Sequence, residues 1–135
     1  MFDNPEINLH QEFVTSANIV NLFQKYGVPL EPDYVSIDID SADLWVMKSI
    51  MGSYRPRVVS IEYNSNYGGF DGSLAHIDPS IMPTNDYAPP AFPYTCFYGS
   101  SAASIHAAAS REHHYKLVGA VHGLDLVFVR GDLWP

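Results

Sequence analysis

The chain has 135 residues, 47% of them hydrophobic, which is enough for one domain with a modest core. Its formal net charge of −8 argues against a nucleic-acid backbone or an anionic membrane surface as its main partner. A single cysteine, Cys96, excludes an internal disulfide framework. No run of 18 apolar residues and no leader-like N-terminus is present, so we expect a soluble intracellular protein of unresolved compartment, without a transmembrane segment.

The first elements expected are a strand and a helix. Residues 7–14 alternate apolar and polar side chains for most of their length, which predicts a strand with one face covered. Thr15 or Ser16 then caps a helix from residue 17 to residue 26, whose apolar residues recur at helical spacing. Gly27 is expected to end this helix in the left-handed conformation.

Two short runs of largely apolar, β-branched residues form the centre of the predicted fold. Residues 34–37 and 58–61 are typical of strands buried on both faces of a parallel sheet. Ser41 is expected to cap a helix over residues 42–51, which provides the crossover that a parallel pair requires. In sheets of this type the ligand crevice lies beyond the carboxyl ends of the strands.

Polar residues follow both strands and place an acidic crevice at that edge. Asp38 and Asp40 come after the first strand, and Glu62 and Asn64 come at the end of the second. The aspartates can contact a ligand, or they can be acids that stabilise the start of the next helix. Glu62 can likewise have only a structural hydrogen-bonding role.

Residues 64–98 show no periodicity and are rich in glycine, proline and aromatic residues. A loop of this length in a small domain is typical of a lid, a binding loop or an interface arm. An alanine-rich helix over residues 102–112 follows, and residues 116–121 and 124–130 are expected to form an antiparallel hairpin at one edge of the sheet. The predicted fold is one α/β domain over residues 1–135, with a mostly parallel, Rossmann-like sheet, helices on its faces and an antiparallel C-terminal hairpin.

Several of these segments together resemble a known family. They are SIDIDSADLW at residues 36–45, YRPRVVSIEYN at 54–64, GSS at 99–101, HYKLV at 114–118 and LDLVFVR at 124–130, with NPEINL at 4–9 before them. The set is similar to the later half of FkbM-like, S-adenosylmethionine-dependent methyltransferase domains. This resemblance covers nearly the whole chain, apart from the long loop, and implies a truncated methyltransferase sheet with S-adenosylmethionine as cofactor.

The resemblance also implies what the chain lacks. In that family the cofactor is held mainly by a first strand, a glycine-rich turn and an acid that ends a second strand. No glycine-rich turn between strand and helix precedes Asp38, so the chain is expected to begin at about the third strand of the family's sheet. We therefore expect it to be incomplete as a catalyst, and whether it is an enzyme stays open.

Six residues at this edge of the sheet are candidate site residues. The resemblance implies cofactor binding by Asp38, Asp40 and Ser41 and catalytic roles for Glu62 and Asn64, and the position of His122 at the hairpin adds it as a third catalytic candidate. His122 can act as a base from the hairpin turn, although a lone histidine is more often a surface residue. We assign no metal site, because the alternative of a divalent ion on Asp40, Glu62 and Asn64 rests on a spacing that is not diagnostic.

A second function class remains open beside the methyltransferase-like domain. The chain can be a non-catalytic accessory subunit that docks on another protein chain or a larger assembly through its long loop and open sheet edge. The missing glycine turn favours this alternative, and the acids after the strands favour the methyltransferase-like domain.

Overall fold

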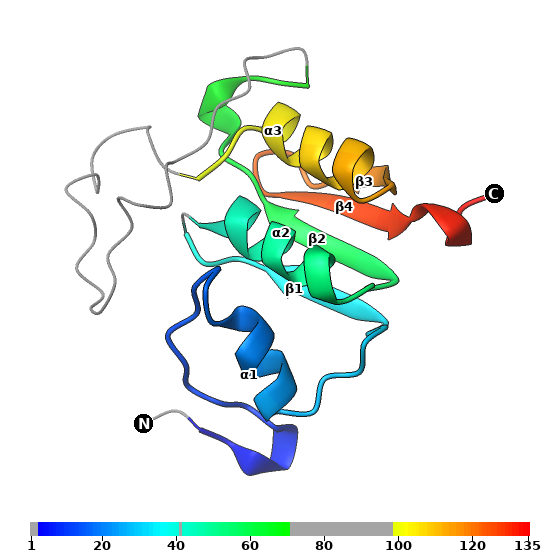
Figure 1. Ribbon diagram of the computed structural model, residues 1–135. Coiled ribbons are helices and arrows are strands. Elements are labelled where there is room, and N and C mark those ends of the chain that lie inside the picture. Colours follow the sequence, from blue (N-terminus) through cyan, green and yellow to red (C-terminus); the bar gives the residue numbers. More distant parts are fainter. Residues whose placement is uncertain (1–2, 41, 71–98) are drawn as a thin grey trace.

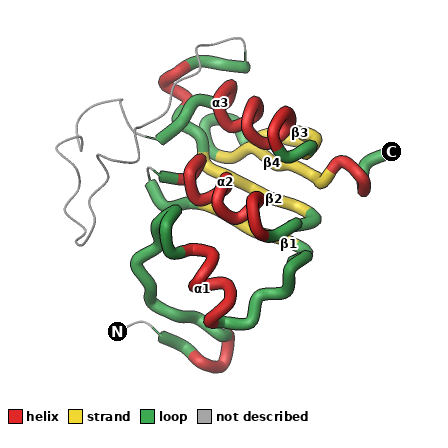
Figure 2. Tube along the Cα trace, in the orientation of Figure 1, coloured by secondary structure: helices red, strands yellow, loops and turns green. Residues whose placement is uncertain are grey.

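The structure, a computed structural model, describes residues 3–40, 42–70 and 99–135 of the chain (Figures 1 and 2). Its α-helices are α1 (Ile19–Lys25), α2 (Asp43–Ser53) and α3 (Ala102–Ala107), and its strands are β1 (Tyr34–Ile37), β2 (Val58–Glu62), β3 (Tyr115–Ala120) and β4 (Asp125–Arg130). The short helical turns are η1 (Pro5–Ile7), η2 (Ser65–Tyr67), the π-helical η4 (Ala108–Glu112) and η5 (Gly131–Leu133). None of the helices in the described ranges is long and apolar enough to cross a membrane.

The four strands form one mixed sheet in the order β1-β2-β4-β3. β1 and β2 pair in parallel, as predicted, with Tyr34 opposite Val58 and Ile37 opposite Ile61. β4 lies antiparallel between β2 and β3, so β1, β2 and β3 run in one direction and β4 runs in the other. The α/β class and the antiparallel C-terminal hairpin are confirmed. Three of the four strands share a direction, although only one pair of neighbours is parallel.

The strand expected over residues 7–14 is not formed, so this prediction was wrong. Pro5 opens the 3-10 turn η1, and Asn8 (φ 52°) closes it in the left-handed conformation. The alternating apolar side chains lie largely in solvent, with Ile7 70% and Leu9 48% exposed. Among the described residues, β1 pairs only with β2. The N-terminal segment therefore has no strand beside it, and alternation alone cannot hold an unpaired segment extended.

Helix α1 begins two residues later than predicted, at Ile19 after its N-cap Asn18, and Thr15 and Asn18 bond to each other in the turn before it. Asn18 donates its backbone N–H to Thr15 Oγ1 (3.2 Å), and Thr15 donates its own N–H to Asn18 Oδ1 (2.8 Å). Gly27 has φ 68°, the left-handed conformation that was expected after the helix. This cap lets Val28 donate its N–H to Phe23 O (2.9 Å), which satisfies one of the last carbonyls of the helix.

Helix α2 is shifted slightly towards the C-terminus from the predicted range of 42–51, and Gly52 lies inside the helix instead of ending it. The expected N-cap, Ser41, lies outside the described residues. The first turn is held instead by Asp43, whose buried carboxylate accepts the N–H of Ile39 (2.8 Å). This bond fixes the turn between β1 and α2, which is the turn that carries the candidate site.

The helix predicted over residues 102–112 is confirmed, with a change of geometry in its second half. Ser101 Oγ accepts the N–H of Ser104 (3.1 Å) and caps α3. After Ala107 the helix continues as the π-helical turn η4, and His114 follows in the left-handed conformation (φ 62°). Of the predicted long loop, the start forms η2, and residues 71–98 lie outside the described ranges.

The helices lie on one side of the sheet. Figure 1 shows α2 and α3 over the same face, with α1 beside α2. The strand residues that face them are buried, and four of these, Val59, Ile61, Leu126 and Phe128, are at most 1% exposed. On the opposite face Tyr34 is 58% exposed, and its hydroxyl bonds to Ser60 Oγ (2.7 Å). The expectation of helices on both faces is not met within the described part of the chain.

Candidate functional site

Three acidic side chains meet where β1 and β2 end. Because the two strands are parallel, their carboxyl ends lie at the same edge of the sheet. Asp38 and Asp40 follow β1, and Glu62 is the last residue of β2. One carboxylate oxygen from each of the three residues lies within 4.8 Å of the others. We call Asp38, Asp40 and Glu62 the acidic cluster.

The turn after β1 explains how two residues of one short segment contribute to the cluster. Asp40 has φ 66°, a left-handed conformation that aspartate tolerates better than most residues with a side chain. Three residues further on, Asp43 is 2% exposed and binds the N–H of Ile39. The turn is thus tied to the buried start of α2, which holds Asp38 and Asp40 at the edge of the sheet.

The charges of the cluster are not neutralised by basic side chains. Burial, together with the negative charges of Asp43, Asp38, Asp40 and Asp125, raises the pKa of Glu62 to about 7. Burial also raises the pKa of Asp125, to which the charge of Asp38 contributes. Within the described ranges, no lysine or arginine forms an ion pair with the cluster or with Asp125. The edge is therefore a place that attracts cations.

Two further predicted site residues, Asn64 and His122, lie near this edge, and a third, Ser41, cannot be placed. The Oδ1 atom of Asn64 accepts the N–H of Asn66 (2.9 Å) and caps η2, and Asn64 is 3% exposed. His122 is exposed in the turn between β3 and β4. That turn is tied to the end of β2, because Gly123 donates its N–H to Tyr63 Oη (2.9 Å). Ser41 lies outside the described residues.

The acidic cluster can perform two kinds of chemistry. Its three converging carboxylate oxygens, on Asp38, Asp40 and Glu62, are the type of ligand that a hard divalent cation prefers. This set differs from the alternative considered from the sequence, because Asp38 takes the place of Asn64. A carboxyl group with a pKa of about 7, as in Glu62, can also take up a proton near neutral pH as a general base.

Sequence reasoning missed two acids that shape the site. Asp43 lies in the first turn of α2, and its carboxylate also binds the turn of the cluster. Asp125 is the register partner of Glu62 on β4, and its position could have been found by aligning the predicted hairpin against the end of β2. Comparison with protein-family models, with curated proteins and with solved structures gives no match to this chain.

Proposed function

We propose that the chain is a methyltransferase-like domain of the FkbM type, in which the acidic cluster binds S-adenosylmethionine and the methyl acceptor. The proposal rests mainly on one observation: the carboxylates of Asp38, Asp40 and Glu62 converge at the carboxyl ends of two parallel strands without basic partners. The donor set suits the cofactor, because carboxylates accept hydrogen bonds from ribose hydroxyls and attract a positively charged ligand.

The residues of the cluster would have different roles. Asp38 and Asp40, both exposed, would accept hydrogen bonds from the bound cofactor, with Ser41 beside them by resemblance. S-adenosylmethionine, when bound, supplies the electrophilic methyl group. Glu62, whose pKa is about 7, would take the proton from an acceptor hydroxyl as the oxygen gains the methyl group. Asn64 and His122 would contribute to positioning at the same edge.

The rest of the cofactor site would come from outside the described residues. No glycine-rich turn precedes Asp38 in the sequence, and in the described structure β1 pairs only on the side of β2. The second edge of β1 is thus open to another strand, from this chain or from another protein. Catalysis by these residues therefore depends on a partner segment, in agreement with the incomplete catalyst that the resemblance implies.

Calorimetric titration of the folded chain with S-adenosylmethionine and with S-adenosylhomocysteine tests the proposal. We expect S-adenosylmethionine to bind about tenfold more tightly, because only it carries the sulfonium charge that the cluster attracts. Asp38→Asn should remove this preference. Asp33→Asn is the matched control, because Asp33 is 88% exposed, precedes β1 at the opposite edge and pairs with Arg57. A folded chain that binds neither compound would rule the proposal out.

A non-catalytic accessory subunit is the second candidate function, and the open face of the sheet favours it. Tyr34 is 58% and Val118 37% exposed on strands of this sheet, and no described helix covers this face. An accessory subunit that buries this face in an assembly should bind a hydrophobic dye when isolated, and should bind neither form of the cofactor. An isolated chain that is monodisperse, excludes the dye and melts cooperatively would contradict this alternative.

A further inference from the structure

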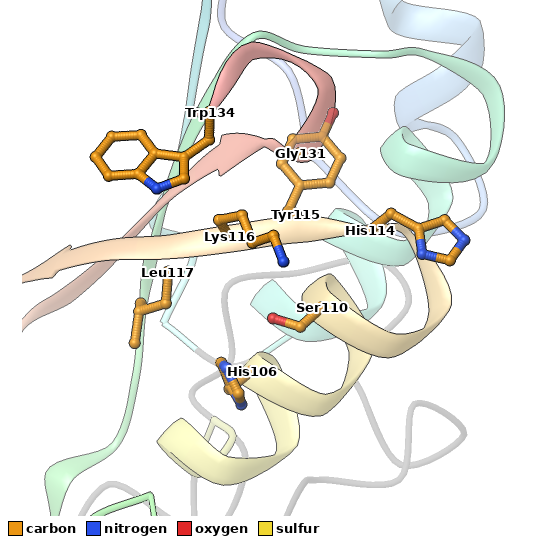
Figure 3. Close-up of a pocket in the computed structure, with 8 residues that line it drawn as sticks. All are labelled: His106, Ser110, His114, Tyr115, Lys116, Leu117, Gly131 and Trp134. Carbon is orange, nitrogen blue, oxygen red and sulfur yellow. The ribbon is translucent and has the colours of Figure 1, made fainter.

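A cavity lies at the opposite end of the sheet from the acidic cluster. It has a volume of about 670 Å³, is open to solvent, and is lined by the α3–η4 helix, the start of β3 and the segment after β4 (Figure 3). β3 runs in the same direction as β1 and β2, so its first residues lie at the edge where β1 and β2 begin. The cavity is within the usual size range of small-molecule sites.

The cavity has a basic character that is unusual in a chain of net charge −8. Its lining includes Lys116, His106, His114 and Ser110, and no described carboxylate lines it. Five of the seven lysines and arginines form an ion pair, and within the described ranges Lys116 and Arg111 form none. In Figure 3 the side chain of Lys116 extends towards the hydroxyl of Ser110. An unpaired ammonium beside a hydroxyl is suited to an oxyanion.

The register of the β3–β4 hairpin adds backbone N–H donors from β3 to the lining of the cavity. Gly131 donates its N–H to His114 O (3.0 Å), and Tyr115 is the register partner of Arg130. Tyr115 and Arg130 are therefore a non-hydrogen-bonded pair, and the N–H groups of Tyr115 and Leu117 point away from β4. Among the described residues β3 pairs only with β4, so these groups point to the free edge of the sheet, where the cavity lies.

An apolar surface lies beside the basic groups. Trp134 is 51% exposed and lies on the other side of β3 from Ser110 in Figure 3, with Leu117 below it. The ring of His106 is held in place by an edge contact with Phe70 (centroids 5.7 Å apart) and by stacking on Phe128 (6.5 Å). The lining of the cavity therefore includes both an aromatic ring and a cation, which fits a ligand with both a ring and a negative charge.

The backbone around the cavity is held in one unusual arrangement. The helix wall contains the π-helical turn η4, a feature that is frequent at functional sites. His114 is left-handed (φ 62°), and a Cβ added at Gly131 would lie 2.4 Å from His114 O. This close approach sets the distance between β3 and the segment that carries Trp134, so the two walls of the cavity keep a fixed spacing.

We propose that this cavity binds a small organic anion, a carboxylate or phosphate ester carried on an aromatic ring. The oxyanion bonds to the ammonium of Lys116 and the hydroxyl of Ser110, and the ring lies on the indole of Trp134. This site shares no residue with the acidic cluster and does not depend on methyl transfer. Binding here adds a small-molecule ligand at the end of the sheet remote from the proposed cofactor.

Nuclear magnetic resonance of the intact chain tests the site, with phenyl phosphate as the probe. The two indole N–H signals report on different places, because Trp134 lines the cavity and Trp45 lies on α2 away from it. The Trp134→Phe variant assigns the two signals. We expect the Trp134 signal to shift with a dissociation constant of about 1 mM or less, and the Trp45 signal to stay unchanged.

Two variants test the contribution of Lys116, and two simpler probes separate the contribution of the ligand's ring from that of its phosphate. Lys116→Gln should weaken phenyl phosphate binding about tenfold, because it removes one charge-assisted hydrogen bond. Arg111→Gln is the matched control, because it removes the other unpaired cation and Arg111 does not line the cavity. Phenol and inorganic phosphate should each bind more weakly than phenyl phosphate. An unshifted Trp134 signal, equal binding by Lys116→Gln, or phenol binding as tightly as phenyl phosphate would overturn the proposal.

Discussion

The acidic residues at the two ends of the sheet differ in whether they form ion pairs. At the end where β1 and β2 begin, Glu31, Asp33 and Asp132 each form an ion pair with an arginine. The hydrogen bond from Arg130 lowers the pKa of Asp132, whereas burial and neighbouring carboxylates raise the pKa of Glu62 at the other end to about 7. Paired acids stabilise the fold, and a group of unpaired acids costs stability. The acidic cluster therefore does not stabilise the fold, and ligand binding explains its presence better than folding does.

The largest expected change in stability is at the end of the sheet with the ion pairs, where the backbones of Gly131 and His114 approach closely. Gly131→Ala should lower the free energy of unfolding by about 2 kcal/mol, because the added methyl group would lie 2.4 Å from His114 O. Gly52→Ala is the control, since no atom lies within 4 Å of the added carbon inside α2, and it should raise stability by about 0.5 kcal/mol. Urea denaturation measures the stability of both variants. If Gly131→Ala stabilised the chain as Gly52→Ala does, His114 and Gly131 could move apart without cost.

Arg130 tests whether ion pairs at this end stabilise through burial. It is 8% exposed and donates to Asp132 Oδ1 (2.7 Å) and to Arg55 O (2.8 Å). Arg130→Met should lower the free energy of unfolding by about 2 kcal/mol, because the charge-assisted hydrogen bonds that the buried guanidinium donates to Asp132 and to Arg55 O are lost. The exposed pair of Arg57 and Asp33 provides the control, and Arg57→Met should change stability by less than about 0.5 kcal/mol. Similar losses in the two variants would contradict the role of burial.

At the acidic end, the Glu62→Gln substitution should change stability by a smaller amount, and should raise it. Its folded-state pKa of about 7 lies above the ordinary value of 4.5, so the folded state binds more protons than the unfolded state between these values. Stability should therefore fall as pH rises through this window, and Glu62→Gln should remove the fall and stabilise the chain by about 1 kcal/mol above pH 7. Thermal melts across the window measure this.

Glu12 is the matched control for that titration. Hydrogen bonds from Lys25 and then Tyr26 lower the pKa of Glu12 below its ordinary value of 4.5. Its contribution to stability is thus present above that value and is lost as pH falls through the lowered pKa. Glu12→Gln should destabilise the chain at neutral pH, the reverse of Glu62→Gln. If both variants shift stability in the same direction, the contrast between paired and unpaired acids is wrong.

The part of the fold that sequence reasoning found is the part whose local pattern agrees with its tertiary surroundings. The runs at 34–37 and 58–61 are strands because their β-branched residues face a core, and residues 7–14 alternate equally well but have no described strand to pair with. Helix ends were found where a capping residue is visible, as at Thr15 and Gly27. Pattern alone therefore predicts elements but not their neighbours.

The same limit applies to the two sites. Asp38, Asp40 and Glu62 could be placed together because parallel strands bring their carboxyl ends to one edge. The basic cavity could not be foreseen, since Lys116 and Trp134 meet only after β4 returns beside β3 and η5 turns back towards His114. The π-helical geometry of η4 also leaves no signal in a run of alanines.

The position of β4 has a consequence for how the domain forms during synthesis. β4 fills the place between β2 and β3, so the second edge of β2 stays unpaired until residues 125–130 have left the ribosome. A nascent chain that ends before Asp125 holds β1 and β2 as an isolated pair, with the apolar Val59 and Ile61 lacking their partners Phe128 and Leu126. The basic cavity is therefore completed only by this late step, and the strands that hold the acidic cluster gain their second neighbour at the same step.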